Sequence, residues 1–461
     1  MKLFDDSSSK TNQEINARVF VNSGPLKGVN ICVIGGGFVG LSAAAGFSQF
    51  GHSVVCVEND ARRLKQLQEG KVPFFEPELE ELLVRSIESK RLTFSGDLAQ
   101  AVKGQKAIFV TVGTPTGVDG RTDLGALEDV ILALSEVIEP DQVVVLKSTV
   151  PVGTGKLIES MLCQNGRKKT PFAVINNPEF LREGSAVYDF FKPQRIVVGG
   201  KNQEAVDLIV NIYKLGMSQP VPFFITNNET AEMIKYASNA FLAAKVGYVN
   251  ELAGLCDHLG VNVLEVARAM GLDPRIGSEF LEPGPGWGGS CFHKDLKEFS
   301  GLAETKGYPL LITEAVLASN RRQHNLVVEK IKKLVGTLKG AKIGVLGLAF
   351  KANTSDIRES PAIAVVQKLV AQGAKVTAYD PKAMEFAREL LPQVVFAGSP
   401  YETVKDSDCL VILTEWREFQ LLDFKLVSET MRRPNIVDAR NLLTPEQLTR
   451  YGFNYSGMGQ T

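Results

Sequence analysis

A glycine-rich turn between two apolar strands most strongly constrains the fold of this chain. The run 29–34 leads into GGGFVG (35–40), a helix-forming run of small residues that ends at Gly51, and a second apolar run that ends at Glu58. Strand, G-x-G-x-x-G, helix, strand and acid in this order are typical of a dinucleotide-binding βαβ unit. The glycines permit a tight turn and let backbone N–H groups approach a pyrophosphate at the helix N-terminus. The pattern predicts a Rossmann-like domain.

Glu58 discriminates between the two nicotinamide dinucleotides. Its carboxylate stands 23 residues after Gly35, where such a group accepts hydrogen bonds from ribose hydroxyls and repels a 2′-phosphate. NAD is therefore the expected cofactor rather than NADP. Arg63 follows five residues later, where it lies against the adenosine or is solvated; the local pattern fits both.

Helix and strand signals keep alternating through the first half of the chain. Apolar runs at 107–112, 143–146 and 172–175 are typical of buried strands, and helices are expected at 76–87 and 123–138. Ligands bind at the carboxyl ends of such strands. Thr114 and Thr149 follow two of the strands, either as cofactor contacts or as ordinary turn residues.

Glu179 and Glu183 follow the third of these strands and stand four residues apart. A helical turn there would place both carboxylates on one face, where like charges repel unless a ligand or a proton intervenes. One of the two is therefore a candidate proton acceptor. The alternative is a solvated helix face.

The middle of the chain is helical and carries a second pair of polar residues. The run 229–260 is rich in alanine and leucine and contains no proline, and another helical segment is expected at about 310–337. A helix this long bridges domains or pairs with a second subunit. Lys235 and Asn239 share one face of it, and both side chains can donate to an oxyanion.

The stretch EPGPGWGGSCFHKD (282–295) presents a thiol directly after a glycine-rich loop. If a helix starts here, Lys294 and Asp295 lie on the turn beside Cys291. A nearby cation lowers the pKa of a thiol and raises the thiolate fraction. Taken alone, Cys291 is more typical of a buried structural cysteine than of a nucleophile, and the rest of the chain reverses this preference.

The last third repeats the plan of the first. GAKVTAYD (373–380) matches GHSVVCVE (51–58), and both follow a strand, a loop and a helix, although the second copy lacks G-x-G-x-x-G. Its long loop carries Lys351 and Arg358, which suit an anion. The predicted fold class is α/β, with two Rossmann-like doubly wound domains joined by a long central helix and a small helical domain. The expected boundaries are a tail at 1–27 and domains at 28–225, 226–338 and 339–461.

Composition excludes several classes of function. Lys and Arg total 51 against 52 Asp and Glu, so no basic field invites nucleic acid. The six cysteines form no CxxC pair and only four histidines are present, so neither a metal site nor a disulfide framework is expected, and a reducing cytoplasm is favoured. No apolar run is long enough to span a membrane, and the first residues are unlike a signal peptide.

The motifs taken together resemble those of the nucleotide-sugar 6-dehydrogenases, the UDP-glucose/GDP-mannose dehydrogenase family, over about 28–445. The matching blocks, in chain order, are GGGFVG, EGKVPFFEPEL, TPT with GRTDL, STVPVGT, NPEFLREG, ETAEMIKYASNAF, RIG with GWGGSCFHKD, GLAFKANTSDIRESPA and VDARN. The resemblance implies a four-electron oxidation of a sugar alcohol to a carboxylate, through a thioester at the cysteine, with two NAD reduced per sugar. Phe292 and Lys294-Asp295 match the UDP-glucose branch best, so UDP-glucose is the expected substrate and UDP-glucuronate the expected product.

Residue roles are implied by the same resemblance. Cys291 is the nucleophile, Lys235 and Asn239 stabilise an alkoxide, Asp295 positions the lysine and water, and Glu179 is a candidate base. The matched cofactor positions are Gly35, Gly37, Phe38, Val39, Gly40, Glu58, Arg63, Thr114, Thr149, Glu183 and Arg358, with Thr149 also placed among the catalytic residues. The matched substrate positions are Glu179, Phe180, Leu181, Arg182, Glu183, Lys235, Asn239, Arg275, Phe280, Gly284, Gly286, Gly288, Lys351 and Arg440. Arg275 matches an arginine that a neighbouring subunit supplies, which implies a homodimer.

Four positions depart from the family pattern, and several readings of function stay open. Glu58 replaces the usual Asp, Trp287 and Ser355 keep packing roles, and His293 either tunes the thiol or fills space. Within the family, the alternative substrates are GDP-mannose, a UDP-N-acetyl-hexosamine and dTDP-glucose. Outside it, a two-electron hydroxyacid dehydrogenase needs no cysteine, and a non-enzymatic NAD-binding protein leaves Cys291 without a role.

Overall fold

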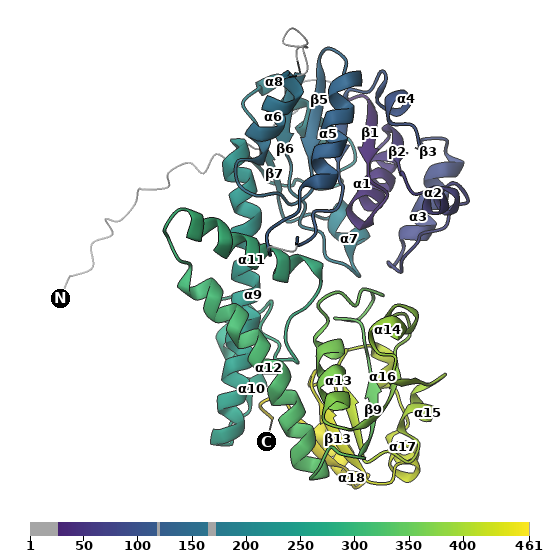
Figure 1. Cartoon of the computed structure of the whole chain (residues 1–461), viewed down its shortest axis with the longest axis vertical. Helices are drawn as coiled ribbons and strands as arrows, with labels where there is room; N and C mark the ends of the chain where they lie inside the picture. The colour runs from purple at the N-terminus through teal and green to yellow at the C-terminus, as the bar shows by residue number, and fades with distance from the viewer. Residues whose placement is uncertain (1–25, 118–119, 165–171, 461) are drawn as a thin grey trace, which may run out of the picture.

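The computed structural model describes residues 26–117, 120–164 and 172–460. Except for its last two residues, the expected tail at 1–27 lies outside the described residues. Two α/β units lie at opposite ends of the long axis of the molecule, and a bundle of long helices runs along one side of both (Figure 1). No described helix is long and apolar enough to cross a membrane.

The first unit is built on an eight-stranded sheet with the order β3-β2-β1-β4-β5-β6-β7-β8. The strands are β1 (Asn30–Ile34), β2 (Ser53–Val57), β3 (Leu92–Ser95), β4 (Ala107–Val110), β5 (Gln142–Leu146), β6 (Phe172–Asn176), β7 (Ile196–Gly199) and β8 (Phe223–Thr226). Neighbours are parallel except β6 and β7. Every residue of β4 and β5 is buried, because helices cover both faces of a parallel sheet.

In the described part of the chain, helices α1 to α8 flank this sheet. They are α1 (Phe38–Gln49), α2 (Ala61–Gln68), α3 (Leu79–Glu88), α4 (Leu98–Val102), α5 (Gly125–Val137), α6 (Thr154–Gln164), α7 (Ala186–Phe191) and α8 (Gln203–Lys214). The small residues of α1 let it pack closely, since a Cβ at Gly46 would lie 2.1 Å from the ring of Phe190. The strand and helix signals of the first half are thus confirmed as elements.

The central helices are α9 (Asn228–Leu259), α10 (Val263–Gly271), α11 (Ser290–Thr305) and α12 (Leu311–Val335). Asn227 caps the start of α9 by accepting from the N–H of Thr230, and Gly260 ends it in the left-handed conformation. The expected long helix from Glu229 is therefore confirmed to within a residue at each end. α9 packs along α11 and α12 and touches β6 and β7 of the first sheet.

The second unit has a six-stranded parallel sheet with the order β11-β10-β9-β12-β13-β14. Its strands are β9 (Lys342–Leu346), β10 (Lys375–Tyr379), β11 (Val395–Phe396), β12 (Cys409–Ile412), β13 (Asn435–Asp438) and β14 (Asn454–Gly457). Its helices are α13 (Pro361–Ala371), α14 (Met384–Leu390), α15 (Pro400–Val404), α16 (Arg417–Gln420), α17 (Phe424–Thr430) and α18 (Pro445–Arg450). In chain order of strands this is the 3-2-1-4-5-6 arrangement that also opens the first sheet, so the expected fold class of two doubly wound units is confirmed.

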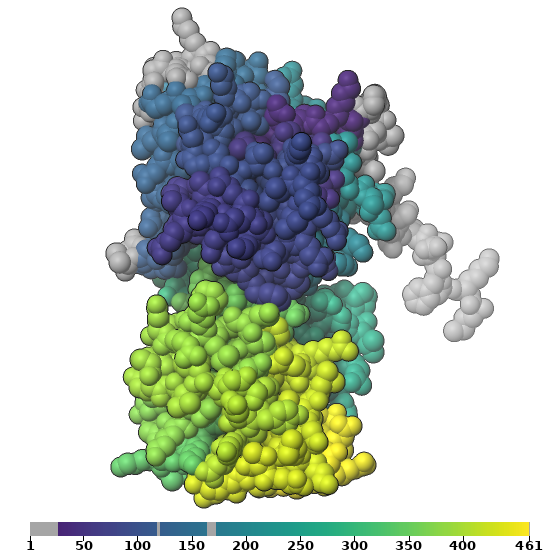
Figure 2. Space-filling model, turned by 90° about the vertical axis from the view of Figure 1, so that its right-hand side faces the viewer, coloured from purple at the N-terminus to yellow at the C-terminus, as the bar shows by residue number. Residues whose placement is uncertain are grey.

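The two units meet along a seam between the purple-to-blue and the green-to-yellow surfaces in Figure 2. At this seam the N–H of Phe75 donates to the hydroxyl of Ser355 at 3.2 Å. The ammonium of Lys382 lies 4.4 Å from the centre of the Phe75 ring. Gly184, after β6, lies so close to the second unit that a Cβ would be 2.9 Å from the carbonyl oxygen of Asn353. Loops that follow the strands of both sheets therefore face each other.

Candidate functional site

The turn between β1 and α1 has the shape of a pyrophosphate cradle. Gly35 has a φ of +107°, and a Cβ at Gly40 would lie 1.8 Å from the carbonyl oxygen of Gly35. Gly37 precedes the first residue of α1, no described side chain caps that end, and a Cβ on Gly37 would meet no described residue other than its chain neighbours. The first N–H groups of a helix lack intrahelical partners and favour an anion. These residues fit a dinucleotide.

Glu58 and Arg63 both lie over this turn. Glu58 is buried at the end of β2, accepts from the N–H of Asp60 at 3.0 Å, and has an oxygen 2.8 Å from the Cβ position of Gly36. The guanidinium of Arg63 donates to the carbonyl of Gly36 at 3.1 Å and lies 3.8 Å from Glu58. Arg63 is thus placed beside the turn rather than in open solvent. Both residues are in position to contact the ribose end of a dinucleotide.

The two threonines lie at neighbouring strand ends. Thr114, after β4, donates its hydroxyl to the carbonyl of Thr149, after β5, at 2.8 Å. The hydroxyl of Thr111, where β4 ends, donates to the carbonyl of Gly35 at 3.0 Å. The loops that carry Thr114 and Thr149 are therefore fixed beside the dinucleotide turn.

One face of α9 gathers the polar residues of the middle of the chain. The ammonium of Lys235 lies 2.9 Å from a carboxylate oxygen of Glu179, and both side chains are buried. The amide of Asn239 donates to Asp295 at 2.6 Å. The other oxygen of Asp295 accepts from Lys294 at 2.6 Å. The structure thus brings Lys235, Asn239, Glu179 and Asp295 together, although they come from three separate segments.

Glu179 and Glu183 do not lie on a helix, and the expectation of a shared helical face is wrong. Residues 177–184 are irregular. Glu76 accepts from the N–H groups of Gly184 and Ala186 at 2.6 and 2.8 Å, and Glu179 accepts from the N–H of Leu181. These side chains satisfy the backbone donors, so the segment needs no helical hydrogen bonds. Glu179 turns to α9, while Glu183 turns to the second unit.

Glu183 lies where the two units meet. Its carboxylate is 3.4 Å from the guanidinium of Arg358, which also binds Asp356. The pKa of Glu183 is raised to about 8, chiefly by burial and also by the charge of Asp356, while Arg358 opposes the rise. The sequence placed Glu183 and Arg358 beside the cofactor; the structure places them beside each other.

Cys291 is the second residue of α11, directly after the glycine loop. The pKa of its thiol is raised to about 12, chiefly by burial and also by the charges of Glu183, Glu179 and Asp295. Lys235 lowers the pKa, as a nearby cation is expected to, but burial and these three carboxylates outweigh it.

The other residues near the thiol have partners of their own. Lys294 pairs with Asp295, and His293 lies 3.3 Å from a carboxylate oxygen of Glu359. Burial lowers the pKa of His293. Lys294 and His293 are therefore each paired with a carboxylate, and His293 contacts the second unit.

The loop before Cys291 needs glycine at specific positions. Gly286 has a φ of +124°, and a Cβ there would lie 2.7 Å from the amide oxygen of Asn320. A Cβ at Gly288 would lie 2.5 Å from the carbonyl of Glu359. The backbone of the loop therefore packs directly against α12 and the second unit, with no room for side chains at these two positions.

Three buried amides that the sequence analysis missed hold this loop in place. Asn250 of α9 accepts from the N–H of Gly284 at 2.7 Å, and Gln323 of α12 donates to the carbonyl of Gly284 at 2.7 Å. Asn320 accepts from the N–H of Trp287 and donates to its carbonyl, both at 2.9 Å. The sequence signal that could have revealed them is the placement of amide side chains among the buried residues of α9 and α12.

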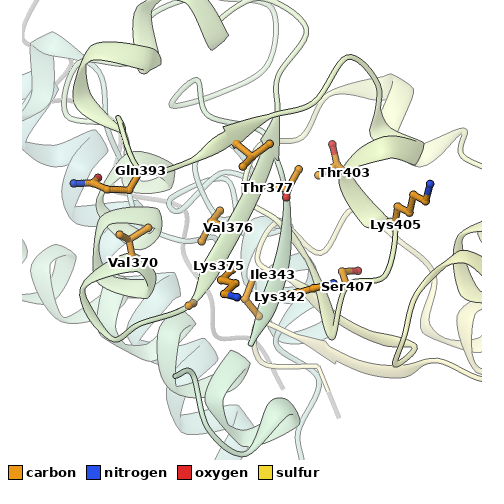
Figure 3. Close-up of a pocket in the computed structure, with 12 residues that line it drawn as sticks. Lys342, Ile343, Val370, Lys375, Val376, Thr377, Gln393, Thr403, Lys405 and Ser407 are labelled. Atoms are coloured by element: carbon orange, nitrogen blue, oxygen red, sulfur yellow. The ribbon is translucent and has the colours of Figure 1, made fainter. Parts of the chain in front are cut away.

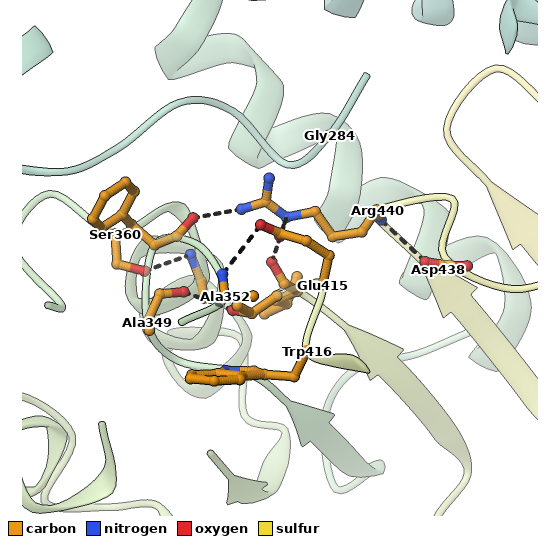
Figure 4. Close-up of polar contacts among 12 residues, drawn as sticks. Gly284, Ala349, Ala352, Ser360, Glu415, Trp416, Asp438 and Arg440 are labelled. Carbon is orange, nitrogen blue, oxygen red and sulfur yellow. Dashed lines mark hydrogen bonds and ion pairs between the residues drawn. The ribbon is translucent and has the colours of Figure 1, made fainter. Parts of the chain in front are cut away.

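Arg440 connects the second sheet to the same loop. Figure 4 shows its guanidinium between the loops that follow β9 and β12: it donates to the carbonyls of Phe350 at 2.6 Å and Leu413 at 2.9 Å, and lies 3.1 Å from Glu415. A Cβ at Gly284 would lie 3.3 Å from the same guanidinium. Lys351 is half-buried nearby; burial lowers its pKa, while Glu183 acts in the opposite direction. The guanidinium of Arg440 therefore lies against the glycine loop.

Other predicted substrate residues stay at the edge of this cluster. Phe180 lies between two cations, with the Arg195 guanidinium 3.9 Å and the Lys235 ammonium 5.3 Å from its ring centre. Arg182 pairs with Asp189. The backbone N–H of Leu181 binds Glu179. Of the predicted substrate residues, Phe180 and Leu181 thus support Lys235 and Glu179, whereas Arg182 turns away from them.

Phe280 and Arg275 lie further along the chain. Phe280 adopts a φ of +65°, with its ring centre 6.4 Å from that of Phe292. Arg275 pairs with Asp273, and its side chain is 87% exposed. Arg275 therefore lies outside the cluster of its own chain.

A cavity of about 420 Å³ lies elsewhere, in the second unit. It is lined by Lys342 and Lys375, the first residues of β9 and β10, and by Thr377, Thr403 and Lys405 (Figure 3). It thus opens at the amino ends of those strands, whereas Arg440 and the glycine loop lie at the carboxyl ends. We take the Cys291 cluster as the candidate site. Among the described residues, no group of His, Cys, Asp and Glu is arranged to hold a metal ion.

Family models match all three parts of the chain. The NAD binding domain of the UDP-glucose/GDP-mannose dehydrogenase family matches residues 29–216, its central domain 229–322 and its UDP binding domain 344–445. The dinucleotide turn lies in the first, Lys235 and Cys291 in the second, and Arg440 in the third.

Individual relatives are similar over nearly the full chain. UDP-glucose 6-dehydrogenase of Rhizobium meliloti (strain 1021) is 43% identical over 94% of this chain and 100% of its own. UDP-glucose 6-dehydrogenase TuaD of Bacillus subtilis (strain 168) is 40% identical over 93% of each chain. A solved UDP-glucose dehydrogenase from Pyrobaculum islandicum is 37% identical with a TM-score of 0.88, covering 96% of this chain and 100% of that one. The expected enzyme class and the NAD cofactor are confirmed, and the chain belongs to the UDP-glucose/GDP-mannose dehydrogenase family of NAD-dependent enzymes.

Proposed function

We propose that this enzyme oxidises UDP-glucose to UDP-glucuronate in a four-electron reaction, with a covalent intermediate on Cys291 and two NAD reduced per sugar. The observation that carries the proposal is the arrangement around the thiol. Lys235, Glu179 and Asp295 act on it electrostatically, and the N-terminal end of α11 holds it next to the glycine loop. The relatives named UDP-glucose 6-dehydrogenase support UDP-glucose, rather than another nucleotide sugar, as the substrate of this enzyme.

The reaction balances with the groups present. NAD, when bound, supplies the hydride acceptor in both oxidations. The first oxidation removes a hydride from C6 of glucose and a proton from its hydroxyl, which gives an aldehyde. The Cys291 sulfur then forms a bond to C6 while the thiol proton passes to the carbonyl oxygen, which gives a thiohemiacetal. Loss of the second hydride from C6 and of that hydroxyl proton gives a thioester. Water adds to that carbonyl and the C–S bond breaks, which releases the carboxylate and restores the thiol.

The polar residues of α9 have donors to spare for the developing oxyanion. Lys235 has three N–H groups, of which Glu179 takes one, and Asn239 has two, of which Asp295 takes one. The remaining donors are free to stabilise negative charge on the sugar oxygen. Glu179, held against Lys235, is the proposed proton acceptor, and Asp295 positions Asn239.

The stoichiometry of NADH tests this proposal. With limiting UDP-glucose and excess NAD, we expect two NADH and one UDP-glucuronate per sugar, since only the thioester route carries the aldehyde on to the acid. Absorbance of NADH and chromatography of the sugar nucleotide give the ratio. A ratio of one would instead support a two-electron dehydrogenase. GDP-mannose, UDP-N-acetylmannosamine and dTDP-glucose in the same assay serve as competing substrates.

We also propose a homodimer through the exposed face of α9. Phe241, Tyr248 and Leu255 recur every seven residues along this helix, and all three are more than half exposed. A helix with apolar residues on its outward face is expected to pack against another surface. Arg275 is exposed in its own chain, which is compatible with a role in the site of a partner.

Substitution of Leu255 by glutamate tests the proposed dimer. Leu255→Glu would bury a charge in the proposed interface, so we expect a roughly tenfold or larger rise in the dimer dissociation constant. Sedimentation over a range of protein concentrations measures it. Leu421→Glu is the control, because Leu421 is 71% exposed in the second unit. Equal self-association of both variants would contradict the proposal.

A further inference from the structure

A buried carboxylate outside the proposed chemistry connects the segments that carry it. Glu232 lies on α9, one turn before Lys235, and is only 2% exposed. One oxygen accepts from the N–H of Gly153 at 2.6 Å. The other accepts from the N–H of Gly155 at 2.8 Å and from the amide of Asn176 at 3.2 Å. Four elements therefore meet at this carboxylate: α9, the β5–α6 loop, the start of α6 and the end of β6.

The donors belong to loops that carry predicted site residues. Gly153 ends the loop that begins after β5 and contains Thr149. Asn176 is the last residue of β6 and stands three residues before Glu179. Both loops leave the carboxyl edge of the first sheet, and both are held by the same side chain.

A second side chain of α9 strengthens the contact. Asn228, one turn before Glu232, accepts from the N–H of Asn176 at 3.0 Å and donates to the carbonyl of Val174 at 3.2 Å. A Cβ at Gly155 would lie 3.0 Å from the Asn228 side chain, so α6 begins in direct contact with α9. Figure 1 shows the first turns of α9 beside α6.

We propose that Glu232 is a positioning residue for the reaction, whose carboxylate holds the Thr149 loop and the Glu179 loop in register with the turn of α9 that carries Lys235. The inference rests on the proposed function. Burying a carboxylate is unfavourable unless several donors satisfy it, and here three donors converge from segments that must be aligned. A cap for α6 alone would need the two backbone N–H groups and not Asn176.

Titration of Glu232 gives a readout that a purely structural role would not. The pKa of Glu232 is raised to about 7, chiefly by burial and also by the charge of Glu229, while the two backbone N–H groups and Asn176 oppose the rise. The charged group facing it from α6 is Lys156, which pairs with Glu229. Protonation would direct an O–H at a backbone N–H, so the contact is complete above about pH 7 and weakens below it.

Glu232→Gln tests the proposal, with Glu229→Gln as the matched control. Glu229 pairs with Lys156 on the exposed side of the same two helices, so its loss removes a surface ion pair between them. In Glu232→Gln the new NH2 group faces one of the backbone donors, and leaving a buried donor unsatisfied predicts roughly tenfold faster amide exchange in the segment 149–155. We expect kcat of Glu232→Gln to fall by a similar factor and KM for UDP-glucose to change less than about twofold. In the wild type we expect kcat to decline as the pH falls below about 7, and this decline should disappear in Glu232→Gln.

Two results would overturn the proposal. One is a loss of turnover in Glu232→Gln with unchanged exchange at 149–155; the other is faster exchange with unchanged kcat. If Glu232→Gln does not fold, Glu232→Asp keeps the charge but withdraws it by one methylene, and an intermediate loss of both protection and kcat is expected. A wild-type enzyme inactive on UDP-glucose would contradict the proposed function, while hydrogen exchange would still decide whether Glu232 holds the two loops.

Discussion

Replacement of Cys291 by serine is expected to stop release of UDP-glucuronate, with kcat falling by about 10³-fold or more. A serine hydroxyl is a far weaker nucleophile than a thiolate, and it forms an ester in place of the thioester. The first oxidation does not use the sulfur. We therefore expect at most one NADH per active site, seen as a burst without continued turnover. Rapid-mixing absorbance records the burst, and mass spectrometry of the protein detects any trapped sugar adduct.

Cys163→Ser is the matched control for this experiment. Cys163 is a free, half-buried cysteine on α6, and it forms no part of the site. Its substitution should leave kcat within about twofold of wild type, because surface changes away from a site have small effects. Full turnover in Cys291→Ser would refute the thioester route.

Substitution of Lys235 by methionine should have the second largest effect, on both activity and stability. Loss of one oxyanion donor lowers kcat by about 10²- to 10³-fold. The same change leaves the Glu179 carboxylate buried without its 2.9 Å partner. Removing one member of a buried ion pair lowers the free energy of unfolding by about 3–5 kcal/mol. Steady-state kinetics and denaturant unfolding measure the two quantities.

The double variant Lys235→Met with Glu179→Gln separates these effects. A neutral amide at position 179 removes the uncompensated charge, so most of the lost stability should return. Turnover should stay low, because neither the oxyanion donor nor the proton acceptor is restored. Recovery of activity together with stability would mean that Lys235 serves only to pair with Glu179.

Local sequence signals predicted the first βαβ unit and the long central helix well. The turn at 35–40, the small-residue helix after it and the acid at Glu58 all lie within one βαβ unit. The residues that determine this unit are therefore close together in the sequence. The long helix of 229–260 was predictable for the same reason, since no proline interrupts it and Gly260 ends it. Elements whose causes lie within a few residues are readable from the chain.

The irregular segment around Glu179 was not readable, because its partners are distant. Gly184 binds Glu76, which is 108 residues earlier in the chain. The thiol shows the same limit. A cation that lowers the pKa of Cys291 was foreseen, but two of the three carboxylates that raise this pKa come from another loop, and the depth of burial depends on the whole fold.

The spacing of polar residues along α9 was an unused signal. Glu232, Asn239 and Asn250 are 7 and 11 residues apart, which places them on one side of the helix. All three are buried. Buried polar side chains in such a row need partners, so the pattern predicts loops packed along the helix. In the structure these are the β5–α6 loop and the glycine loop.

The seam between the two α/β units has a consequence for how the enzyme is made. Synthesis runs from Gly35 toward Arg440, so the dinucleotide turn leaves the ribosome 405 residues before the guanidinium that faces the glycine loop. Because domains generally fold as units, with the N-terminal one first, the first unit and Cys291 can be present before the second unit is synthesised. A chain that ended before the second unit would contain the dinucleotide turn and Cys291 but would lack Arg440, whose guanidinium lies against the glycine loop.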